Sequence, residues 1–263
     1  MISKIKNIIR YLHILFLQLL TSFKKQIKIE GNCLFIAPHP DDEAFGCGGL
    51  ISHLCTKGVP PHVIIMTRGG ASLKGQLENT PLTKITEEDI IQERRKLTLK
   101  SAKELGIPEE NIHFLDFIDG HISERPKPEL KRLNDLLNEF KPDYVFVPHS
   151  GEGWPDHLAT REIVLSQFSH KENLSNEFSD SQKVTPQIFE YCVWMWYYNV
   201  WNLDWKNAYK FRMSKSEHEV KLRAVNAYIK PLAPNGKPWS GILPKPFIKA
   251  NTCNTELYFK IIS

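Results

Sequence analysis

The chain has 263 residues, 41% of them hydrophobic, and a formal net charge of +4. Its length and apolar content are sufficient for one sizeable core. The mild charge, without a long basic block, argues against a nucleic-acid-binding protein. The five cysteines form no C-x-x-C pair, which argues against a disulfide framework and a thiolate zinc site, so we expect a reduced, cytoplasmic protein.

Residues 1–25 have the pattern of a basic amphipathic helix, with apolar residues at helical spacing from Ile5 to Phe23 and basic residues around them. The uncharged run 11–23 is shorter than the roughly 20 residues that span a bilayer, and "TSFKKQ" is a poor signal-peptide cleavage site. Two interpretations remain open: a helix lying on the inner face of the membrane, or a helix packed on the protein's own core. The first would favour a lipid-linked substrate.

Strand and helix patterns alternate along the rest of the chain. We expect strands at 32–38, 62–67, 112–117 and 144–149, and helices at 43–57, 87–105, 128–140 and 157–168. This alternation predicts an α/β fold with a mostly parallel sheet flanked by helices on both faces.

The domain organisation follows from the same reading. Residues 1–28 form the N-terminal helix region, and residues 29–263 form a single domain. Within it, a Ser/Asn-rich loop at 170–183 divides a core (29–170) from an aromatic-rich C-terminal part (184–263), expected to be a smaller α/β extension.

Two polar clusters follow the first and fourth predicted strands. "HPDDE" contributes His39, Asp41 and Asp42, and "HSGEGWPDH" contributes a second group: His149, Glu152, Asp156 and His157. Ligands of such sheets bind beyond the carboxyl ends of the strands, so the two clusters can converge. Adjacent carboxylates cost free energy unless a positive charge lies among them.

Two explanations of these clusters are available. A set of two histidines and a carboxylate with one free position is what a catalytic zinc ion requires, and a second carboxylate can serve as general base. Alternatively, the acidic residues cap a helix and complement its dipole. The presence of matching clusters at two strand ends favours the metal site.

The stretch "PHPDDEAFGCGG", together with "WPDH", resembles the PIG-L/LmbE-like family of zinc-dependent N-acetylglucosamine deacetylases. The resemblance runs from about residue 31 to the end, with "MTRGG", "KPDYVFVPH" and "EVKLRAVNAYI" in the family's order. It implies a Rossmann-like fold and one zinc ion, with iron(II) as the alternative, bound by His39, Asp42 and His157. Asp41 is then the general base for attack of a zinc-bound water on an acetamide.

The second motif departs from the family's usual His-Pro-Asp-His, because Trp154 occupies the first position. Asp156, which would support that histidine, is retained. His149 or His121 could replace it, or Trp154 could donate its N–H to the substrate. The family's substrate-facing arginine falls on Arg94, for which a solvated helix position is the favoured reading.

The run "VWMWYYNVWNLDW" supplies Trp194, Trp196, Trp201 and Trp205, either as a sugar-stacking wall or, for most of them, as core with Trp194 and Trp196 on a strand. We therefore expect a metal-dependent deacetylase of an N-acetylated amino sugar, on a glycoside or a lipid carrier. The alternatives are an amidase for another small conjugate and a catalytically weak sugar-binding member of the fold. A nucleotide-binding Rossmann protein is disfavoured, since no G-x-G-x-x-G follows the first strand.

Overall fold

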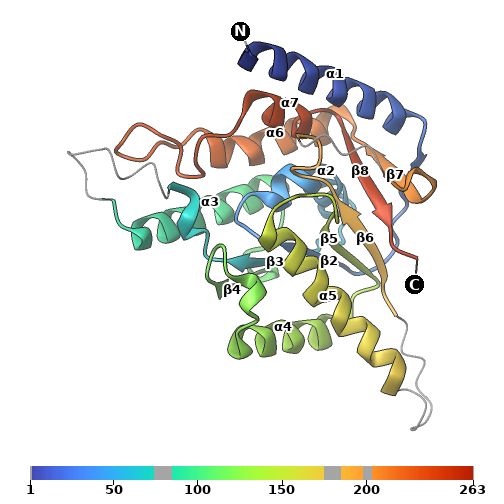
Figure 1. Cartoon of the computed structure of the whole chain (residues 1–263). Helices are drawn as coiled ribbons and strands as arrows, with labels where there is room; N and C mark the ends of the chain where they lie inside the picture. The colour runs from blue at the N-terminus through green and yellow to red at the C-terminus, as the bar shows by residue number, and fades with distance from the viewer. Residues whose placement is uncertain (1, 74–84, 175–184, 198–202, 263) are drawn as a thin grey trace.

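The computed structural model describes residues 2–73, 85–174, 185–197 and 203–262. Within these residues, eight strands form one sheet in the order β1-β7-β8-β6-β5-β2-β3-β4 (Figure 1). The strands β2 to β6 pair in parallel, whereas β8 is antiparallel to both of its neighbours. Their bounds are β1 Lys25–Gln26, β2 Cys33–Ala37, β3 His62–Thr67, β4 Ile112–Phe117, β5 Tyr144–Pro148, β6 Gln187–Tyr191, β7 Ala208–Arg212 and β8 Thr255–Lys260.

The helices agree with the sequence pattern to within two residues over most of the core. They are α1 Ile2–Ser22, α2 Asp42–Thr56, α3 Glu87–Leu105, α4 Lys127–Phe140, α5 Pro155–Leu174, α6 Lys215–Ile229 and α7 Lys245–Asn251. The exception is α5, which begins at Pro155 and continues to Leu174, so residues 170–174, which were expected in a loop, are helical. Proline is favoured in the first turn of a helix, which explains the earlier start.

Alternate residues of the parallel strands supply two separate cores, as expected for a sheet covered on both faces. On one face, Phe35 and Phe146 pack with side chains of α2, α3 and α6. On the other, Ile36 and Val147 pack with side chains of α4 and α5. Figure 1 shows the same division of the helices between the two faces. The predicted α/β fold is therefore confirmed.

The C-terminal part continues the sheet of the core instead of forming a second layer. β6 pairs in parallel with β5, and β8 lies between β6 and β7. α6 packs against α2 and α3, so it shares the apolar core of the N-terminal half. The expected smaller extension is thus joined to the core through both backbone pairing and side-chain packing.

Local sequence determines the ends of α3 and the close packing of α2. α3 begins with a capping box in which Thr86 and Asp89 exchange hydrogen bonds, and it ends at Gly106 with φ of 85°. In α2, a Cβ on Gly46 would lie 2.4 Å from the ring of Tyr191, so glycine permits the close approach of this helix to β6.

Two neighbouring histidines lie on β3 and β4. His62 Nδ1 and His113 Nε2 are 3.1 Å apart, and both rings pack on Phe140 at centroid distances of 3.9 and 4.8 Å. Burial, followed by the adjacent His62, lowers the pKa of His113 from 6.5 to about 4. The unfolded chain therefore binds a proton at this position more readily than the folded chain.

We expect His113 to lower the free energy of unfolding as the pH falls from about 6.5, its pKa in the unfolded chain, towards 4, its pKa in the folded chain. His113→Gln keeps a hydrogen-bond partner for His62 but does not titrate, so its melting temperature should fall less over this range. The control is His121→Gln, which removes an exposed histidine. Melting curves recorded from pH 7 to 4 check the prediction, and parallel profiles for wild type and His113→Gln would contradict it.

Candidate metal centre

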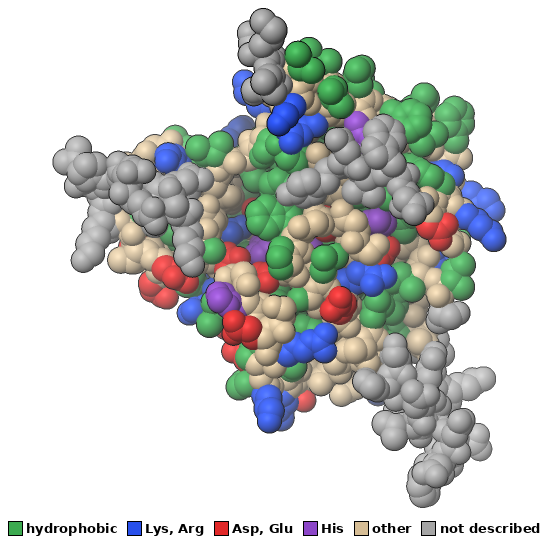
Figure 2. All heavy atoms as spheres, in the orientation of Figure 1, with side chains coloured by type: hydrophobic (Ala, Val, Ile, Leu, Met, Phe, Trp, Pro, Cys, Tyr) green, Lys and Arg blue, Asp and Glu red, His purple; other side chains and the backbone are tan. Residues whose placement is uncertain are grey.

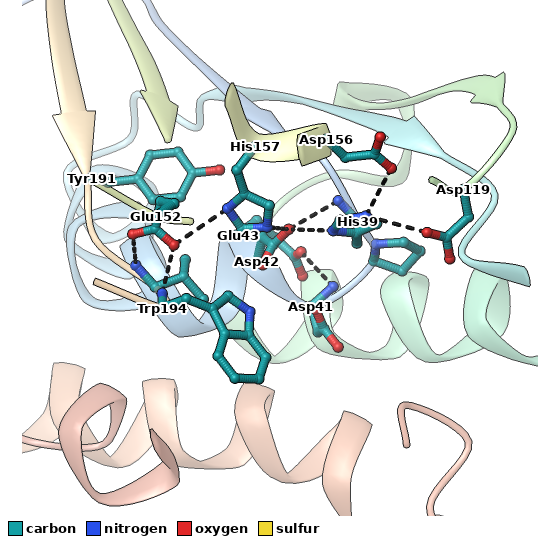
Figure 3. A network of polar contacts seen from close by, with 12 residues as sticks. His39, Asp41, Asp42, Glu43, Asp119, Glu152, Asp156, His157, Tyr191 and Trp194 are labelled. Carbon is teal, nitrogen blue, oxygen red and sulfur yellow. Dashed lines mark hydrogen bonds and ion pairs between the residues drawn. The ribbon is translucent and has the colours of Figure 1, made fainter. Parts of the chain in front are cut away.

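The two polar clusters meet at the carboxyl ends of β2 and β5. After β2 the chain enters α2 on one face of the sheet, and after β5 it enters α5 on the other face. This divergence of neighbouring strands is the topological switch point at which α/β folds bind ligands. Figure 3 shows the side chains from both clusters facing one another there.

His39, Asp42 and His157 form a compact group of nitrogen and oxygen donors. Asp42 Oδ2 is 3.2 Å from His39 Nδ1 and 3.2 Å from His157 Nε2, and the three donor atoms lie within 4.8 Å of one another. Asp42 and His157 are buried. The ring nitrogens of His157 face the carboxylates of Asp42 and Glu152 at 3.2 and 3.3 Å, but neither contact has hydrogen-bond geometry. Two imidazoles and a carboxylate, gathered in a buried position, fit a divalent cation of the zinc type.

The side chains of Asp41 and Asp42 do not cap α2. Asp41 occupies the N-cap position of α2, yet its side chain makes no capping hydrogen bond. Asp42 Oδ2 accepts a hydrogen bond from the backbone N–H of His39 at 3.0 Å, which turns the carboxylate back towards the two histidines. The capping explanation therefore does not account for this pair.

Burial and charge separate the acidities of the two adjacent aspartates. For Asp42, burial acts to raise the pKa, but His157 and His39 outweigh it and hold the pKa well below its usual range. For Asp41, burial raises the pKa to about 8, against the opposing effect of Arg94. Asp41 also has a positive φ of 119°, a strained backbone conformation of the kind found at functional sites.

Arg94 is buried against Asp41, so the prediction of a solvated helix position was wrong. The side chain is 4% exposed. Its Nη2 donates to Asp41 Oδ2 at 2.9 Å and to the carbonyl of Pro40, and its Nη1 donates to the carbonyl of Gly69 at 3.1 Å. α3 turns this residue inward onto the loops that follow β2 and β3. Gly69 has φ of 71°, and a Cβ there would lie 2.8 Å from Arg94 Nη1.

Glu152 holds the outer nitrogen of His157, a contact that sequence reasoning missed. Its Oε2 lies 3.3 Å from His157 Nδ1. The buried carboxylate also accepts the backbone N–H groups of Val193 at 2.8 Å and Trp194 at 2.5 Å. Carboxylates commonly orient the histidines that bind metals in this way. The residue lies within the predicted second cluster, but its distance from His157 depends on how the loop folds.

Two further carboxylates face the outer nitrogen of His39. Nε2 of this ring is 3.2 Å from Asp156 Oδ2 and 3.3 Å from Asp119 Oδ1. Asp156 is anchored by the backbone N–H groups of Gly120 at 2.7 Å and Ile122 at 3.2 Å. Asp156 thus contacts His39, whereas the sequence pattern predicted support for a side chain at position 154. Asp119, in "FIDGHI", was not predicted to contribute.

Trp154, His149 and His121, the residues considered as replacements for the first histidine of the second motif, lie in different surroundings. Trp154 is 41% exposed, and its ring centroid is 5.4 Å from that of Trp194. His149 is buried, accepts the N–H of Gly151 at 2.9 Å and faces Glu190 at 3.7 Å. His121 is exposed and pairs with Glu124 at 2.7 Å. Neither histidine belongs to the donor groups found in the described residues.

The tryptophan run divides between core and surface. Trp196 is buried in a cluster with residues of α1 and β8, and Trp205 packs against that cluster. Trp194 is half-buried, with its ring 4.2 Å from that of Phe247. Since β6 ends at Tyr191, the prediction that Trp194 and Trp196 alternate on a strand was wrong. Trp201 lies outside the described residues.

Comparison with known families supports the resemblance read from the motifs. The model of the family described as PIG-L, GlcNAc-PI de-N-acetylase, matches residues 34–168, which include both polar clusters. The chain belongs to the PIG-L family. A probable N-acetyl-alpha-D-glucosaminyl L-malate deacetylase of Bacillus subtilis is 26% identical over 52% of this chain and 61% of its own length. The match thus spans about three fifths of that relative.

Solved structures with the same fold include PIG-L relatives and an enzyme of another type. An N,N'-diacetylchitobiose deacetylase from Pyrococcus horikoshii has a TM-score of 0.54 at 25% identity, covering 78% of this chain and 73% of its own. A 4-carboxy-2-hydroxymuconate hydratase from Pseudomonas putida has a TM-score of 0.55 at 14% identity, covering 89% and 97%. Because a hydratase shares the fold, the reaction has to be argued from the side chains of the site.

Proposed function

We propose that this PIG-L protein is a metal-dependent deacetylase that removes the acetyl group from an N-acetylated amino sugar of the N-acetylglucosamine type. The observation that carries the proposal is the position of Asp41. This residue directly precedes Asp42 of the His39, Asp42 and His157 group (Figure 3), and its carboxylate accepts a hydrogen bond from Arg94 at 2.9 Å. The catalytic unit is residues 29–263, and residues 1–28 are an attached helix region.

His39, Asp42 and His157 would hold one divalent metal, with zinc as the first choice and iron(II) as the alternative. A metal bound there would polarise the amide carbonyl and lower the pKa of a water molecule. Glu152 and Asp156 lie at the outer nitrogens of the two histidines and would accept their N–H groups, which would leave the inner nitrogens to donate to the metal. These outer carboxylates would therefore act as positioning residues.

Asp41 is the proposed general base. In its ionised form it accepts a proton from the attacking water and then gives that proton to the amine as the C–N bond breaks. Arg94 favours the ionised carboxylate, while burial favours the protonated one, a balance that suits a group which must take and return a proton. Since Trp154 replaces a titratable histidine in the second motif, proton delivery to the amine is assigned to Asp41.

Trp154 and Trp194 are the proposed sugar-facing surface. The two rings are neighbours, and flat ring faces suit the C–H faces of a pyranose. N-acetylglucosamine derivatives appear in the names of relatives of this chain, which supports the same class of substrate. The sugar's aglycone can be soluble or lipid-linked.

The test is release of acetate from a panel of N-acetylglucosamine conjugates, with metal analysis of the same sample. We expect about one divalent metal per chain and acetate release that stops on chelation and returns when metal is restored. Metal-independent acetate release would refute the proposed chemistry. A protein that binds metal but cleaves none of the acetamides would refute the proposed reaction.

The second candidate is a catalytically weak sugar-binding member of the family, which the replacement of histidine by Trp154 favours. Trp154→His restores the family residue at an exposed position, so folding should be little affected. If the wild-type protein has turnover near zero and Trp154→His gains turnover, the native chain would be the catalytically weak, sugar-binding member. Substantial turnover by the wild-type protein would exclude it.

We expect Glu152→Gln to weaken metal binding by about 10- to 100-fold, the usual effect of removing an outer-shell partner. The amide cannot accept the three backbone N–H groups of residues 193–195 and also the proton of His157 Nδ1, so the histidine loses its orientation. Metal titration of the purified apoprotein measures the effect. Glu190→Gln is the matched control, since Glu190 is a buried carboxylate that contacts Arg161 and faces His149. Equal affinity in the two variants would contradict the assignment.

A further inference from the structure

α1 exposes a continuous apolar stripe to solvent. Leu12 is 61% exposed and Phe23 at the end of the helix is 78% exposed. The other members, at spacings of three and four residues, are Ile5, Ile8, Ile9, Leu15 and Leu19. Figure 2 shows hydrophobic side chains gathered along this helix at the top of the molecule. Contiguous exposed apolar surface of this kind is typical of an interaction site.

The opposite face of α1 attaches the helix to the body of the protein. Ile14 and Leu17 are buried in a cluster with residues of α7 and β8, and His13 and Thr21 are buried beside them. Lys24 adds a bond to the carbonyl of Trp205 at 2.8 Å. The interpretation of a helix packed on the core is therefore correct for this face, and the other face presents the apolar stripe.

Basic side chains border both ends of the stripe. Lys6 is exposed near its start, and Lys25 and Lys28 are exposed beyond its end. α7, which packs against α1, adds exposed Lys245 and Lys249. No aspartate or glutamate occurs before Glu30. On the adjoining loop, the acidic residue Asp204 is exposed. The border of the stripe therefore carries a clear excess of positive charge.

A line of ring contacts connects α1 with the rim of the metal centre. The guanidinium carbon of Arg10 lies 4.0 Å from the ring centroid of Tyr197. The ring of Tyr197 is 5.9 Å from that of Trp194, which is 5.4 Å from that of Trp154. Trp154 directly precedes the helix that carries His157. A continuous chain of side-chain contacts therefore joins α1 to the residue that precedes α5.

We propose that the exposed stripe of α1 docks this protein on an anionic lipid surface, with the helix axis in the plane of the interface. An apolar face a few ångströms deep in the lipid, bordered by lysines at the headgroups, is the arrangement of membrane-surface helices. In the part of the chain that the structure describes, no helix is long and apolar enough to cross a bilayer.

Charge decides between a lipid surface and a second copy of the chain as the occupant. Pairing two stripes would bring the basic border of one helix against the basic border of the other, at a cost in repulsion. An anionic headgroup layer instead supplies the opposite charge along the whole border. The docking surface is independent of the proposed reaction, because it uses no residue of the metal centre.

Co-sedimentation of the full-length protein with vesicles tests this inference. One set contains phosphatidylcholine with phosphatidylglycerol, and the other contains phosphatidylcholine alone. The triple variant Leu12→Gln/Leu15→Gln/Leu19→Gln should raise the lipid concentration needed for half-maximal binding by at least about tenfold. It removes three of the apolar side chains that would be buried in the lipid. Lys6→Gln/Lys25→Gln/Lys28→Gln should abolish the preference for the anionic set. The matched control is Val59→Gln/Leu232→Gln, which alters two exposed apolar residues outside α1.

All variants change exposed side chains, and melting temperatures within a few degrees of the wild type verify that they fold. Absence of wild-type binding to anionic vesicles would overturn the inference, as would equal binding by wild type and the leucine variant. A dimer in light scattering that the leucine variant dissociates, without vesicle binding, would assign the stripe to a second copy. Since no step of the assay requires turnover, failure here is distinct from failure of the deacetylase proposal.

Discussion

Asp41→Asn is expected to lower turnover by about 10²-fold or more while leaving metal content and fold unchanged, because general-base catalysis typically supplies 10² to 10⁴. The amide oxygen can still accept the bond from Arg94, and asparagine tolerates the positive φ of this position. The loss would therefore report the missing base. Steady-state acetate release, with metal analysis and a melting curve of the same sample, measures it.

The matched control is Asp116→Asn. Asp116 also has a positive φ, of 64°, but it lies on the exposed end of β4 near Arg95 and Arg132. Its replacement should leave turnover within about twofold of the wild type, as for most surface substitutions. If Asp41→Asn retained turnover close to that of the control, another group would have to take the proton, and the mechanism proposed for Asp41 would be wrong.

His157→Ala is expected to lose most of its bound metal and nearly all activity. The imidazole is completely buried between Asp42 and Glu152, with contacts of 3.2 and 3.3 Å. Its removal deletes one of three proposed ligands and also leaves two buried carboxylates without their shared partner. We therefore expect the melting temperature to fall as well, because an unpaired buried charge is strongly destabilising.

His149→Ala separates the loss of metal from the loss of packing. His149 is a buried histidine of the same size, in contact with Phe259 and facing Glu190. It should destabilise the fold without lowering the metal content. Metal analysis after exhaustive dialysis checks both variants. Full metal occupancy in folded His157→Ala would remove this residue from the proposed ligand set.

The sequence by itself determined the elements of the core and the place where the two polar clusters come together. Apolar runs in β2 and β5 and the helical periods of α3 and α4 gave bounds within about two residues of the structure, the usual uncertainty at helix ends. These patterns are local, because an element's buried face recurs at its own geometric period. The position of both polar clusters at strand ends was sufficient to predict that they meet.

Tertiary structure decided which further side chains complete the site. Arg94 looks like any arginine on a charged helix, and its burial against Asp41 depends on how α3 packs on two loops. The contacts of Glu152 with His157 and of Asp119 with His39 link residues whose separation in space no local period encodes. The same holds for Asp156, whose partner was predicted at position 154 and is instead His39.

The N-terminal helix shows the same division most clearly. Its apolar spacing predicted an amphipathic helix, and the structure contains one at Ile2–Ser22. The pattern could not tell which face would be covered, since both a core and a lipid surface accept apolar side chains. The fold settled this by burying the narrower face of Ile14 and Leu17 on α7 and β8 and leaving the broader stripe exposed. Sequence periodicity determines that a face exists, whereas the neighbours supplied by distant segments determine what that face contacts.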